Sequence, residues 1–241
     1  MEISIVIPAY NEAESLPVLI REITDAVTRV PVREILVIDD ASNDNTREVL
    51  ADLCKNFPLL RVLRHTRRSG QSTALWTGVR FARGDLIVTM DGDGQNDPAD
   101  IPLLFTEYSR YAESAPQTLV AGQRRKRHDD AIRRISSRIA NGARAAVLQD
   151  GVRDTGCSLK LFRKNDFLVM PFFNHIHRFI PAMMKAHGAH IVLVDVGHRP
   201  RLRGVSKYGL WDRLWVGIAD IFGVRWLTSR LKPETEVVEE S

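Results

Sequence analysis

The sequence contains few cysteines and no long apolar run. Only two of its 241 residues are cysteines, Cys54 and Cys157, and they lie far apart without the spacing of a metal site. This pattern argues against disulfide bonds and predicts a reduced, cytoplasmic protein. No stretch reaches the roughly 18–20 uncharged apolar residues that a membrane-spanning helix requires. Residues 1–4 lead directly into a strand pattern, so we also expect no signal peptide.

The chain also lacks the two common glycine-rich phosphate-binding motifs. Neither G-x-G-x-x-G after the first strand nor G-x-x-x-x-G-K-[ST] occurs in it. Nucleotide-binding dehydrogenases and kinases, which are the alternative for an α/β pattern, are therefore disfavoured. A phosphate group must instead be bound by a metal ion and by arginine side chains.

Cationic side chains are unevenly distributed. The net charge is only +4, in a composition of 44% hydrophobic and 27% charged residues that supports a folded core. One segment sets eight cationic residues against two aspartates: Arg124, Arg125, Lys126, Arg127, Arg133, Arg134, Arg138 and Arg144. A second cluster comprises Arg199, Arg201, Arg203 and Lys207. Such clusters favour the phosphates of nucleotides or lipid headgroups. Because they contain few aromatic residues, nucleic acid is not the expected partner.

The first half of the chain alternates strand and helix patterns. Short apolar runs indicate strands at 3–7, 35–38, 61–63 and 86–90. Helical spacing indicates helices at 16–27, 46–57 and 72–82, and Pro98 opens the next one. This alternation predicts an α/β fold with a mostly parallel central sheet and helices on both sides. Ligands bind such sheets beyond the carboxyl ends of the strands.

Three polar motifs follow strands at those ends. They read Pro8-Ala9-Tyr10-Asn11-Glu12, Asp39-Asp40-Ala41-Ser42 and Asp91-Gly92-Asp93-Gly94-Gln95. Each motif alone is compatible with ordinary turn chemistry, because Asp, Asn, Gly and Pro are common turn residues. Their coincidence at three strand ends favours a binding site.

The third motif has the composition of a divalent-metal site. Asp91 and Asp93 lie within one turn with Gln95 close behind, and such hard oxygen ligands suit Mg²⁺ or Mn²⁺ bridging a diphosphate. A metal there would neutralise the charge that develops on a departing nucleoside diphosphate. An EF-hand calcium loop is the alternative. It is disfavoured because the motif follows a strand and because Pro102 occupies the position of the required glutamate.

Together these motifs resemble the signature of family 2 glycosyltransferases, and more narrowly the dolichol-phosphate mannose synthase group with its bacterial polyprenyl-phosphate relatives. The resemblance spans about residues 1–215. It continues through Ala121-Gly122-Gln123-Arg124, Asp154-Thr155-Gly156-Cys157, His177-Arg178-Phe179-Ile180-Pro181 and Gly204-Val205-Ser206-Lys207-Tyr208-Gly209. The chain differs from the mannose synthases in having Gly92-Asp93-Gly94 where they often show Asp-Ala-Asp-Leu, which leaves the donor sugar open.

The resemblance implies a GT-A-type, Rossmann-like nucleotide-diphospho-sugar transferase fold. It also implies inverting transfer of a hexose (mannose, glucose or N-acetylhexosamine) from a GDP- or UDP-linked donor. The donor-binding residues that it implies are Pro8, Tyr10, Glu12 and Asp40 at the base and ribose, Asp91, Gly92, Asp93 and Gln95 at the sugar and metal, and Arg201, Arg203 and Lys207 at the diphosphate. The catalytic residues that it implies are Asp91, Asp93, Arg124 and Arg134, with Asp93, Gln95 and Asp91 as the metal ligands.

A polyprenyl phosphate is the expected acceptor on chemical grounds as well. A phosphomonoester with a second pKa of about 6 is already largely ionised at neutral pH. It needs no general base, only cationic groups that receive and position it. By their match to family positions, Arg124 and Arg134 are expected to contact this phosphate. Asp154 is expected to orient an arginine there, or else to cap the Thr155-Gly156 turn. Arg178 is a further acceptor-site cation, and for His177 we expect a core or arginine-supporting role.

The C-terminal part of the chain predicts a helix that lies on a membrane surface. Apolar residues recur at helical spacing from Leu210, and charged residues interrupt them. Tryptophan favours the membrane interface, and three of the four tryptophans lie here. A core-packing or dimer helix is the alternative. We therefore divide the chain into a GT-A domain (1–205), an amphipathic interface helix (206–228) and a disordered acidic tail (229–241). The expected location is the inner face of the cell membrane, reached by peripheral contact or through a membrane protein partner. The sequence is compatible with a homo-oligomer.

Two other functions are compatible with the motifs. One is a glycosyltransferase acting on a soluble or saccharide hydroxyl acceptor, which would need a carboxylate base late in the chain, and only Asp154 or Asp195 could serve. The other is a non-catalytic nucleotide-sugar-binding protein. The intact Asp91, Asp93 and Gln95 argue against it, because such a protein has no need of metal ligands.

Overall fold

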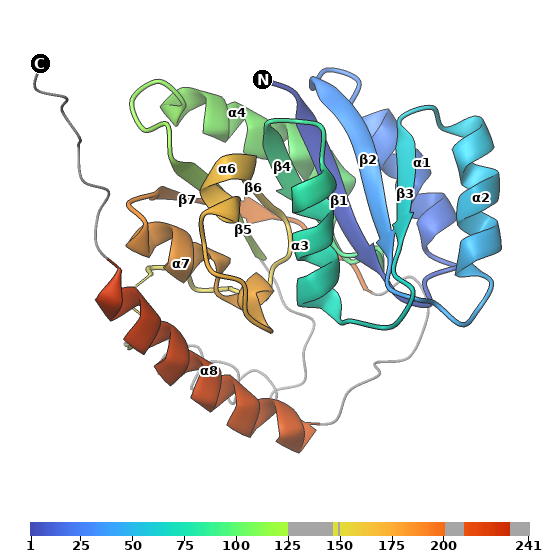
Figure 1. Ribbon diagram of the computed structural model, residues 1–241. Coiled ribbons are helices and arrows are strands. Elements are labelled where there is room, and N and C mark those ends of the chain that lie inside the picture. The colour runs from blue at the N-terminus through green and yellow to red at the C-terminus, as the bar shows by residue number, and fades with distance from the viewer. Residues whose placement is uncertain (125–146, 149, 201–209, 232–241) are drawn as a thin grey trace, which may run out of the picture.

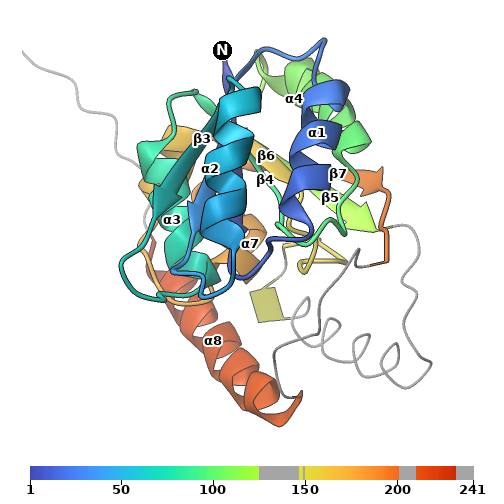
Figure 2. The ribbon, with the colours of Figure 1, turned by 90° about the vertical axis from the view of Figure 1, so that its right-hand side faces the viewer.

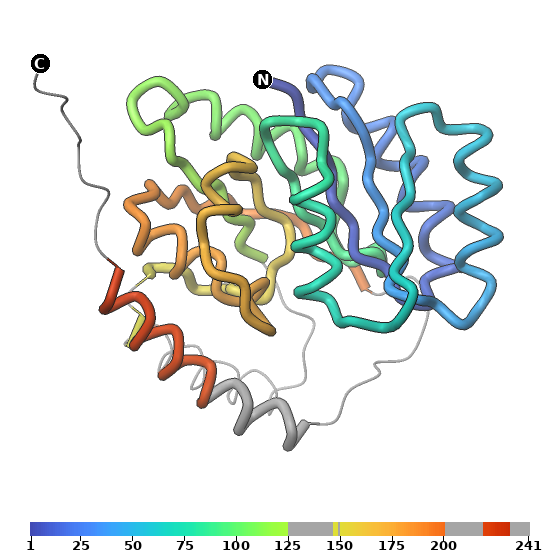
Figure 3. The backbone as a smooth tube through the Cα atoms, viewed as in Figure 1, coloured from blue at the N-terminus to red at the C-terminus, as the bar shows by residue number. Residues whose placement is uncertain are grey.

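The structure, a computed structural model, describes residues 1–124, 147–148, 150–200 and 210–231, with the side chains of 210–218 left out (Figure 3). One seven-stranded sheet runs through this part of the chain in the order β3-β2-β1-β4-β6-β5-β7. Its strands are β1 (Ile3–Ala9), β2 (Val32–Asp39), β3 (Leu60–Arg64), β4 (Leu86–Thr89), β5 (Thr118–Arg124), β6 (Lys160–Arg163) and β7 (His190–Val196).

The sheet is mostly parallel, as predicted. Strand β1 pairs in parallel with β2 and β4, β2 with β3, and β5 with β7. The exception is β6, which lies antiparallel between β4 and β5. The sequence analysis did not predict this strand. Because β6 runs the other way, its first residues lie beside the carboxyl ends of β4 and β5, at the edge where parallel sheets bind ligands.

Helices cover both faces of the sheet (Figure 1). The helices are α1 (Leu16–Ala26), α2 (Thr46–Asn56), α3 (Gln71–Phe81), α4 (Ile101–Tyr111), α6 (Lys164–Leu168), α7 (Ile180–Ala186) and α8 (Leu210–Arg230), with short 3-10 turns η1 (Pro98–Asp100) and η2 (Ile176–Arg178). One hydrophobic core joins α1, α2 and α4 to one face, and a second core joins α3, α6 and α7 to the other. Figure 2 shows α3 on one side of the sheet and α1 and α4 on the opposite side.

The alternation of side chains along β1 explains how one strand supplies both cores. Ile3, Ile5 and Ile7 point into the first core, whereas Val6 points into the second, and all four are fully buried. A strand buried on both faces therefore reads as a continuous apolar run, which is why the sequence pattern located the central strands to within a few residues.

Helix α8 packs beside α7 and crosses the lower edge of the molecule in Figure 1. Its bounds, Leu210–Arg230, differ from the predicted 206–228, since the helix continues two residues into the segment assigned to the tail. The remainder of that tail, 232–241, lies outside the described residues. Within the described chain, no helix has the combination of length and apolar character that crossing a bilayer requires.

Candidate active site

Hydrogen bonds between loops bring the three predicted motifs together at the carboxyl ends of β1, β2 and β4. The Asn11 backbone N–H donates to Ser42 Oγ at 2.9 Å, which joins the loop after β1 to the loop after β2. Ser15 Oγ donates to the Gly92 carbonyl at 2.8 Å and to the Glu12 carboxylate at 2.9 Å. Asn11 and Ala41 adopt left-handed backbone conformations, with φ of 55° and 57°. These tight turns fold the loops back onto one another at the sheet edge.

The carboxylate of Asp40, which is predicted to bind the donor, accepts hydrogen bonds from other groups of the protein. Its buried carboxylate accepts hydrogen bonds from His65 Nδ1 at 2.7 Å, the Ser69 N–H at 2.8 Å and the Gly70 N–H at 2.7 Å. Asp40 thereby fixes the loop between β3 and α3. That loop places the Arg68 guanidinium 4.1 Å from the centre of the Tyr10 ring, a cation–π geometry. The structure thus gives Asp40 a positioning role and adds Arg68 to the surroundings of Tyr10.

The acidic loop after β4 has the electrostatics of a cation site. Burial and the neighbouring carboxylate of Asp93 raise the pKa of Asp91 to about 6. Asp91 also accepts a hydrogen bond from Gln71 Nε2 at 2.8 Å, and Asp93 accepts one from the Gln95 N–H at 3.1 Å. Two carboxylates that repel each other in a partly dry site favour a divalent cation.

The donor set restricts which cation fits. Within the described residues, no group of three or more His, Cys, Asp or Glu side chains surrounds a common point. If a metal ion binds here, Asp91, Asp93 and the Gln95 amide would supply oxygen ligands for only part of its coordination shell. Mg²⁺ and Mn²⁺ suit such a site, because they are held by one or two carboxylates together with substrate phosphates and water.

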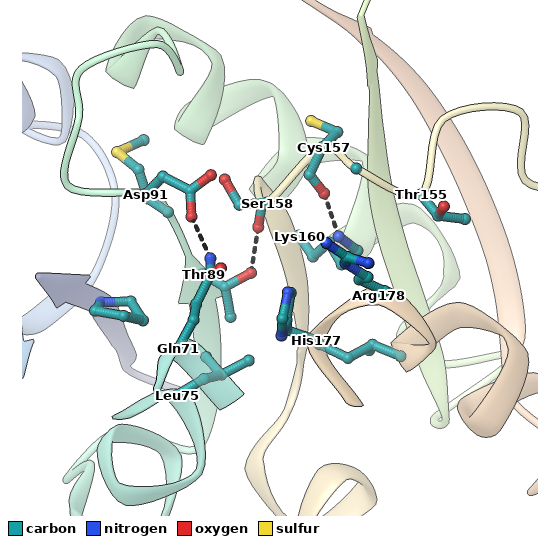
Figure 4. Close-up of a pocket in the computed structure, with 14 residues that line it drawn as sticks. Gln71, Leu75, Thr89, Asp91, Thr155, Cys157, Ser158, Lys160, His177 and Arg178 are labelled. Carbon is teal, nitrogen blue, oxygen red and sulfur yellow. Dashed lines mark hydrogen bonds between the residues drawn. The ribbon is translucent and has the colours of Figure 1, made fainter. Parts of the chain in front are cut away.

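A pocket lies between Asp91 and the second half of the chain (Figure 4). Its volume is about 200 Å³, several times the ~30 Å³ share of a liquid water molecule, so it is a ligand-sized hollow rather than a packing defect. Pro8, Leu75, Met90 and Ile180 supply apolar lining, and Thr155 to Ser158 line it from the loop before β6. The cationic side chains of Lys160 and Arg178 also line this pocket, with the imidazole of His177 beside them.

Arg124 and Asp154 form a partly buried ion pair beside this pocket. Arg124 Nε donates to Asp154 Oδ2 at 2.5 Å and Arg124 Nη2 donates to Oδ1 at 2.7 Å. Buried Gln123 holds the partner in place, since its Oε1 accepts from the Arg153 N–H at 3.2 Å and the Asp154 N–H at 2.9 Å. Asp154 therefore fixes the position of Arg124, which donates two hydrogen bonds to it. That Arg124 contacts the acceptor phosphate stays a prediction.

Several predicted residues lie outside the described part of the chain. These are Arg134, in the segment 125–146, and Arg201, Arg203 and Lys207, in the segment 201–209. Their neighbour Arg199 is described, and it pairs with Glu22 at 2.8 Å and with Asp97 at 2.6 Å. Arg199 therefore anchors the chain after β7 to α1 and to Asp97.

Lys160 and Ser158 are pocket residues that the sequence analysis missed. Lys160 is only 2% exposed and begins β6, where it lies opposite Thr89 in the strand register. A lysine followed by the apolar residues Leu161 and Phe162 in a strand was the available signal, because lysine is almost never fully buried without a reason. His177 was assigned a supporting role, and the structure places it in the pocket wall.

His177 should make the protein less stable in acid. Burial, together with Arg178, Lys160 and His175, lowers the pKa of His177 to about 3. The unfolded chain takes up this proton near pH 6.5, so the stability of the wild type decreases as pH falls below that value. We expect the Tm of His177→Gln, relative to the Tm of the wild type, to be higher at pH 4.5 than at pH 7.5. A difference that does not change with pH would contradict the burial of a neutral imidazole.

Comparison with known proteins identifies the architecture around this site. The model of the family described as glycosyl transferase family 2 matches residues 4–169. This range includes Asp91, Asp93 and the pocket-lining residues from Pro8 to Lys160. The chain belongs to this family.

Two curated relatives are similar to this family 2 glycosyltransferase over most of its length. Dodecaprenyl-phosphate galacturonate synthase of Rhizobium johnstonii is 35% identical over 237 residues, covering 93% of this chain and 66% of the relative. Undecaprenyl-phosphate 4-deoxy-4-formamido-L-arabinose transferase of Aeromonas hydrophila is 34% identical over 213 residues, covering 86% and 63%. The chain therefore spans only 63–66% of the length of these two relatives.

Solved structures confirm the GT-A-type fold. Glucosyl-3-phosphoglycerate synthase from Mycobacterium tuberculosis, crystallised with Mn²⁺ and UDP, superposes with a TM-score of 0.68 at 20% identity, covering 94% of this chain and 79% of that one. Mannosyl-3-phosphoglycerate synthase from Rubrobacter xylanophilus gives 0.69 at 19% identity, covering 98% and 77%. At such identities the likeness concerns the fold.

Proposed function

We propose that this family 2 glycosyltransferase transfers a sugar, with inversion, from a nucleotide diphosphate donor to the phosphate of a polyprenyl phosphate. The two curated relatives, named for dodecaprenyl and undecaprenyl phosphate, support this acceptor class. The observation that carries the proposal is the chemistry of the pocket beside Asp91. Among the described lining residues, those opposite Asp91 are the cations Lys160 and Arg178 and the neutral imidazole of His177, with no carboxylate base.

The donor would lie along the carboxyl ends of β1, β2 and β4. Tyr10, with Arg68 over its ring, and Pro8 would face the base and ribose, and Asp91 would face the sugar. Mg²⁺ or Mn²⁺ held by Asp91, Asp93 and Gln95 would offset the charge on the departing nucleoside diphosphate. The proposed donor is a GDP- or UDP-linked hexose or one of the sugars named for the two relatives.

The carboxylates of the described residues separate this acceptor from a sugar hydroxyl. Among the described residues that line the pocket, Asp91 is the single carboxylate, and it lies on the donor side. Asp154 has both oxygens engaged by Arg124, and Asp195 is exposed on β7. A hydroxyl acceptor would need one of these groups as a base, whereas an ionised phosphate needs only positioning.

A transfer assay with matched acceptors tests the proposal. Purified protein is incubated with Mg²⁺ or Mn²⁺, radiolabelled GDP- and UDP-sugars, and either undecaprenyl phosphate or undecaprenol in detergent. We expect label in the lipid phase with the phosphate and none with the alcohol. Transfer to the alcohol, or donor hydrolysis without a lipid product, would contradict the proposed acceptor.

We also propose that α8 holds the protein against the inner face of the cell membrane. Val224, 3% exposed, packs against the second core, while Phe222 and Trp226 are 65% and 63% exposed. Residues four apart lie on one side of a helix, so the two aromatic rings share an outward face. A helix of this kind inserts its aromatic residues at the level of the lipid headgroups.

Removing this aromatic pair should weaken membrane binding. We expect the double variant Phe222→Ser, Trp226→Ser to co-sediment with anionic liposomes several-fold less than the wild type, because two aromatic rings no longer enter the interface. Turnover on a short, water-soluble prenyl phosphate should be unchanged. The matched control is Phe81→Ser on α3, which is also exposed, at 53%, but lies away from α8. Equal sedimentation of the double variant and the wild type would exclude α8 as the membrane contact.

A further inference from the structure

Lys160 is a buried cation whose hydrogen-bonding capacity is incompletely used. Its ammonium group has three donors, and within the described part of the chain it donates one hydrogen bond, to the Cys157 carbonyl. Burial lowers the pKa of Lys160, against the attraction of Asp91 and Asp154. Burying an ammonium group without partners is costly. The ammonium group lies at the pocket wall, so its two remaining donors can reach a ligand in the pocket (Figure 4).

His177 adds a neutral donor next to this cation. Its Nδ1 lies 2.8 Å from the Oγ of Ser72, a residue of α3 that is 1% exposed. When Ser72 donates this hydrogen bond, the proton of the neutral ring lies on Nε2. Lys160 and His177 come from different elements, β6 and η2, yet both line the pocket. The site is therefore built by the tertiary fold rather than by one local motif.

The nearby Arg124 cannot replace this pair as the sole anion receptor. Asp154 balances its charge with two hydrogen bonds. A phosphomonoester that enters the pocket carries a charge of about −1.5 to −2 at neutral pH and would face the Asp91 carboxylate. Lys160, with Arg178 beside it, supplies the positive charge on the opposite side.

We infer that Lys160 and His177 form a phosphate-binding subsite in the wall of the pocket, which holds the attacking phosphate of the acceptor. The inference rests on the proposed function and adds two residues that directly contact the substrate. Two of the phosphate's oxygens accept hydrogen bonds from the Lys160 ammonium and from His177 Nε2, and a third is directed toward the donor sugar beside Asp91. The same chemistry would also suit the leaving phosphate of the donor, so the experiment compares the two phosphates.

Binding measured without turnover tests the subsite. Geranyl phosphate and a nucleoside diphosphate with Mn²⁺ are titrated separately into wild type, Lys160→Met and Lys160→Arg. Methionine keeps the length of the side chain and removes its charge. We expect Lys160→Met to weaken geranyl phosphate about 10- to 100-fold, as for a lost hydrogen bond to a charged group. Nucleoside diphosphate binding should change less than about twofold, within the spread of ordinary additive effects. Lys160→Arg should recover part of the affinity.

A second variant protects the test against a folding defect. His177→Gln keeps an N–H donor and should weaken geranyl phosphate less than His177→Leu does. Unchanged binding of geranyl phosphate by both Lys160→Met and His177→Leu would overturn the subsite. Weaker nucleoside diphosphate binding with unchanged geranyl phosphate binding would move the subsite to the leaving phosphate and so overturn the inference. If the wild type itself binds no geranyl phosphate, the proposed function fails together with the subsite. If the wild type binds it and only the variants behave differently from expectation, the subsite fails and the proposed function remains.

Discussion

The Asp93→Asn variant is expected to lose turnover by a factor on the order of 10³ in kcat/KM, because an amide no longer offsets the charge of a divalent cation. The fold should persist, since Asp93 accepts a hydrogen bond from the Gln95 N–H, and the amide oxygen of an asparagine can accept the same bond. Removing one of two repelling carboxylates should also lower the raised pKa of Asp91. Initial rates at saturating Mn²⁺ measure the loss of turnover, and the circular dichroism spectrum checks that the fold persists.

The control for this variant is Asp52→Asn, which removes an exposed carboxylate of α2 that pairs with Lys55. Such surface pairs contribute little, so turnover and stability should match the wild type. Addition of EDTA should reduce wild-type turnover to the level of Asp93→Asn. Full turnover in excess EDTA, or near-normal turnover of Asp93→Asn, would contradict the metal site.

The second large effect is expected at the Arg124–Asp154 pair. The two side chains are 14% and 13% exposed, so removal of either one breaks an ion pair in a mostly buried site. Arg124→Ala should lower the free energy of unfolding by about 3 kcal/mol and nearly abolish transfer. Asp154→Asn should destabilise the protein in the same direction. The double variant should cost less than the sum of the two, with a coupling of about 0.5–3 kcal/mol.

Urea unfolding at constant m-value measures these energies. The Lys55–Asp52 pair is the matched control, because both of its side chains are more than 70% exposed and its double-mutant cycle should show little coupling. Additive effects of Arg124→Ala and Asp154→Asn would mean that the pair does not act as a unit. Retention of full transfer by Arg124→Ala would remove it from the active site.

The donor side of the site was predictable because its residues follow strands that are legible in the sequence. Apolar runs located β1, β2 and β4, and the geometry of a parallel sheet then placed Pro8, Asp40 and Asp91 at one edge. The positioning role of Asp40 could not be predicted from the sequence. Its partners, His65, Ser69 and Gly70, lie 25 to 30 residues away, and no periodicity reports such a contact.

The acceptor side was less predictable for a topological reason. The short strand β6 turns antiparallel between β4 and β5, and this reversal brings Lys160 to the edge where Asp91 lies. His177 joins them from a 3-10 turn between α6 and α7. Each of these placements depends on long-range pairing rather than on local pattern, so single-sequence reasoning recognised Arg124 and Asp154 by resemblance and missed Lys160.

The most direct test of the central claim is the chemical identity of the bond that forms. Lipid product from the transfer reaction is examined by ³¹P NMR and mass spectrometry. Transfer to the phosphate predicts that the phosphomonoester signal of the acceptor is replaced by that of a phosphodiester, with a mass increase of one sugar residue. A product that keeps its free phosphomonoester, or a labelled sugar recovered only in the aqueous phase, would contradict the account.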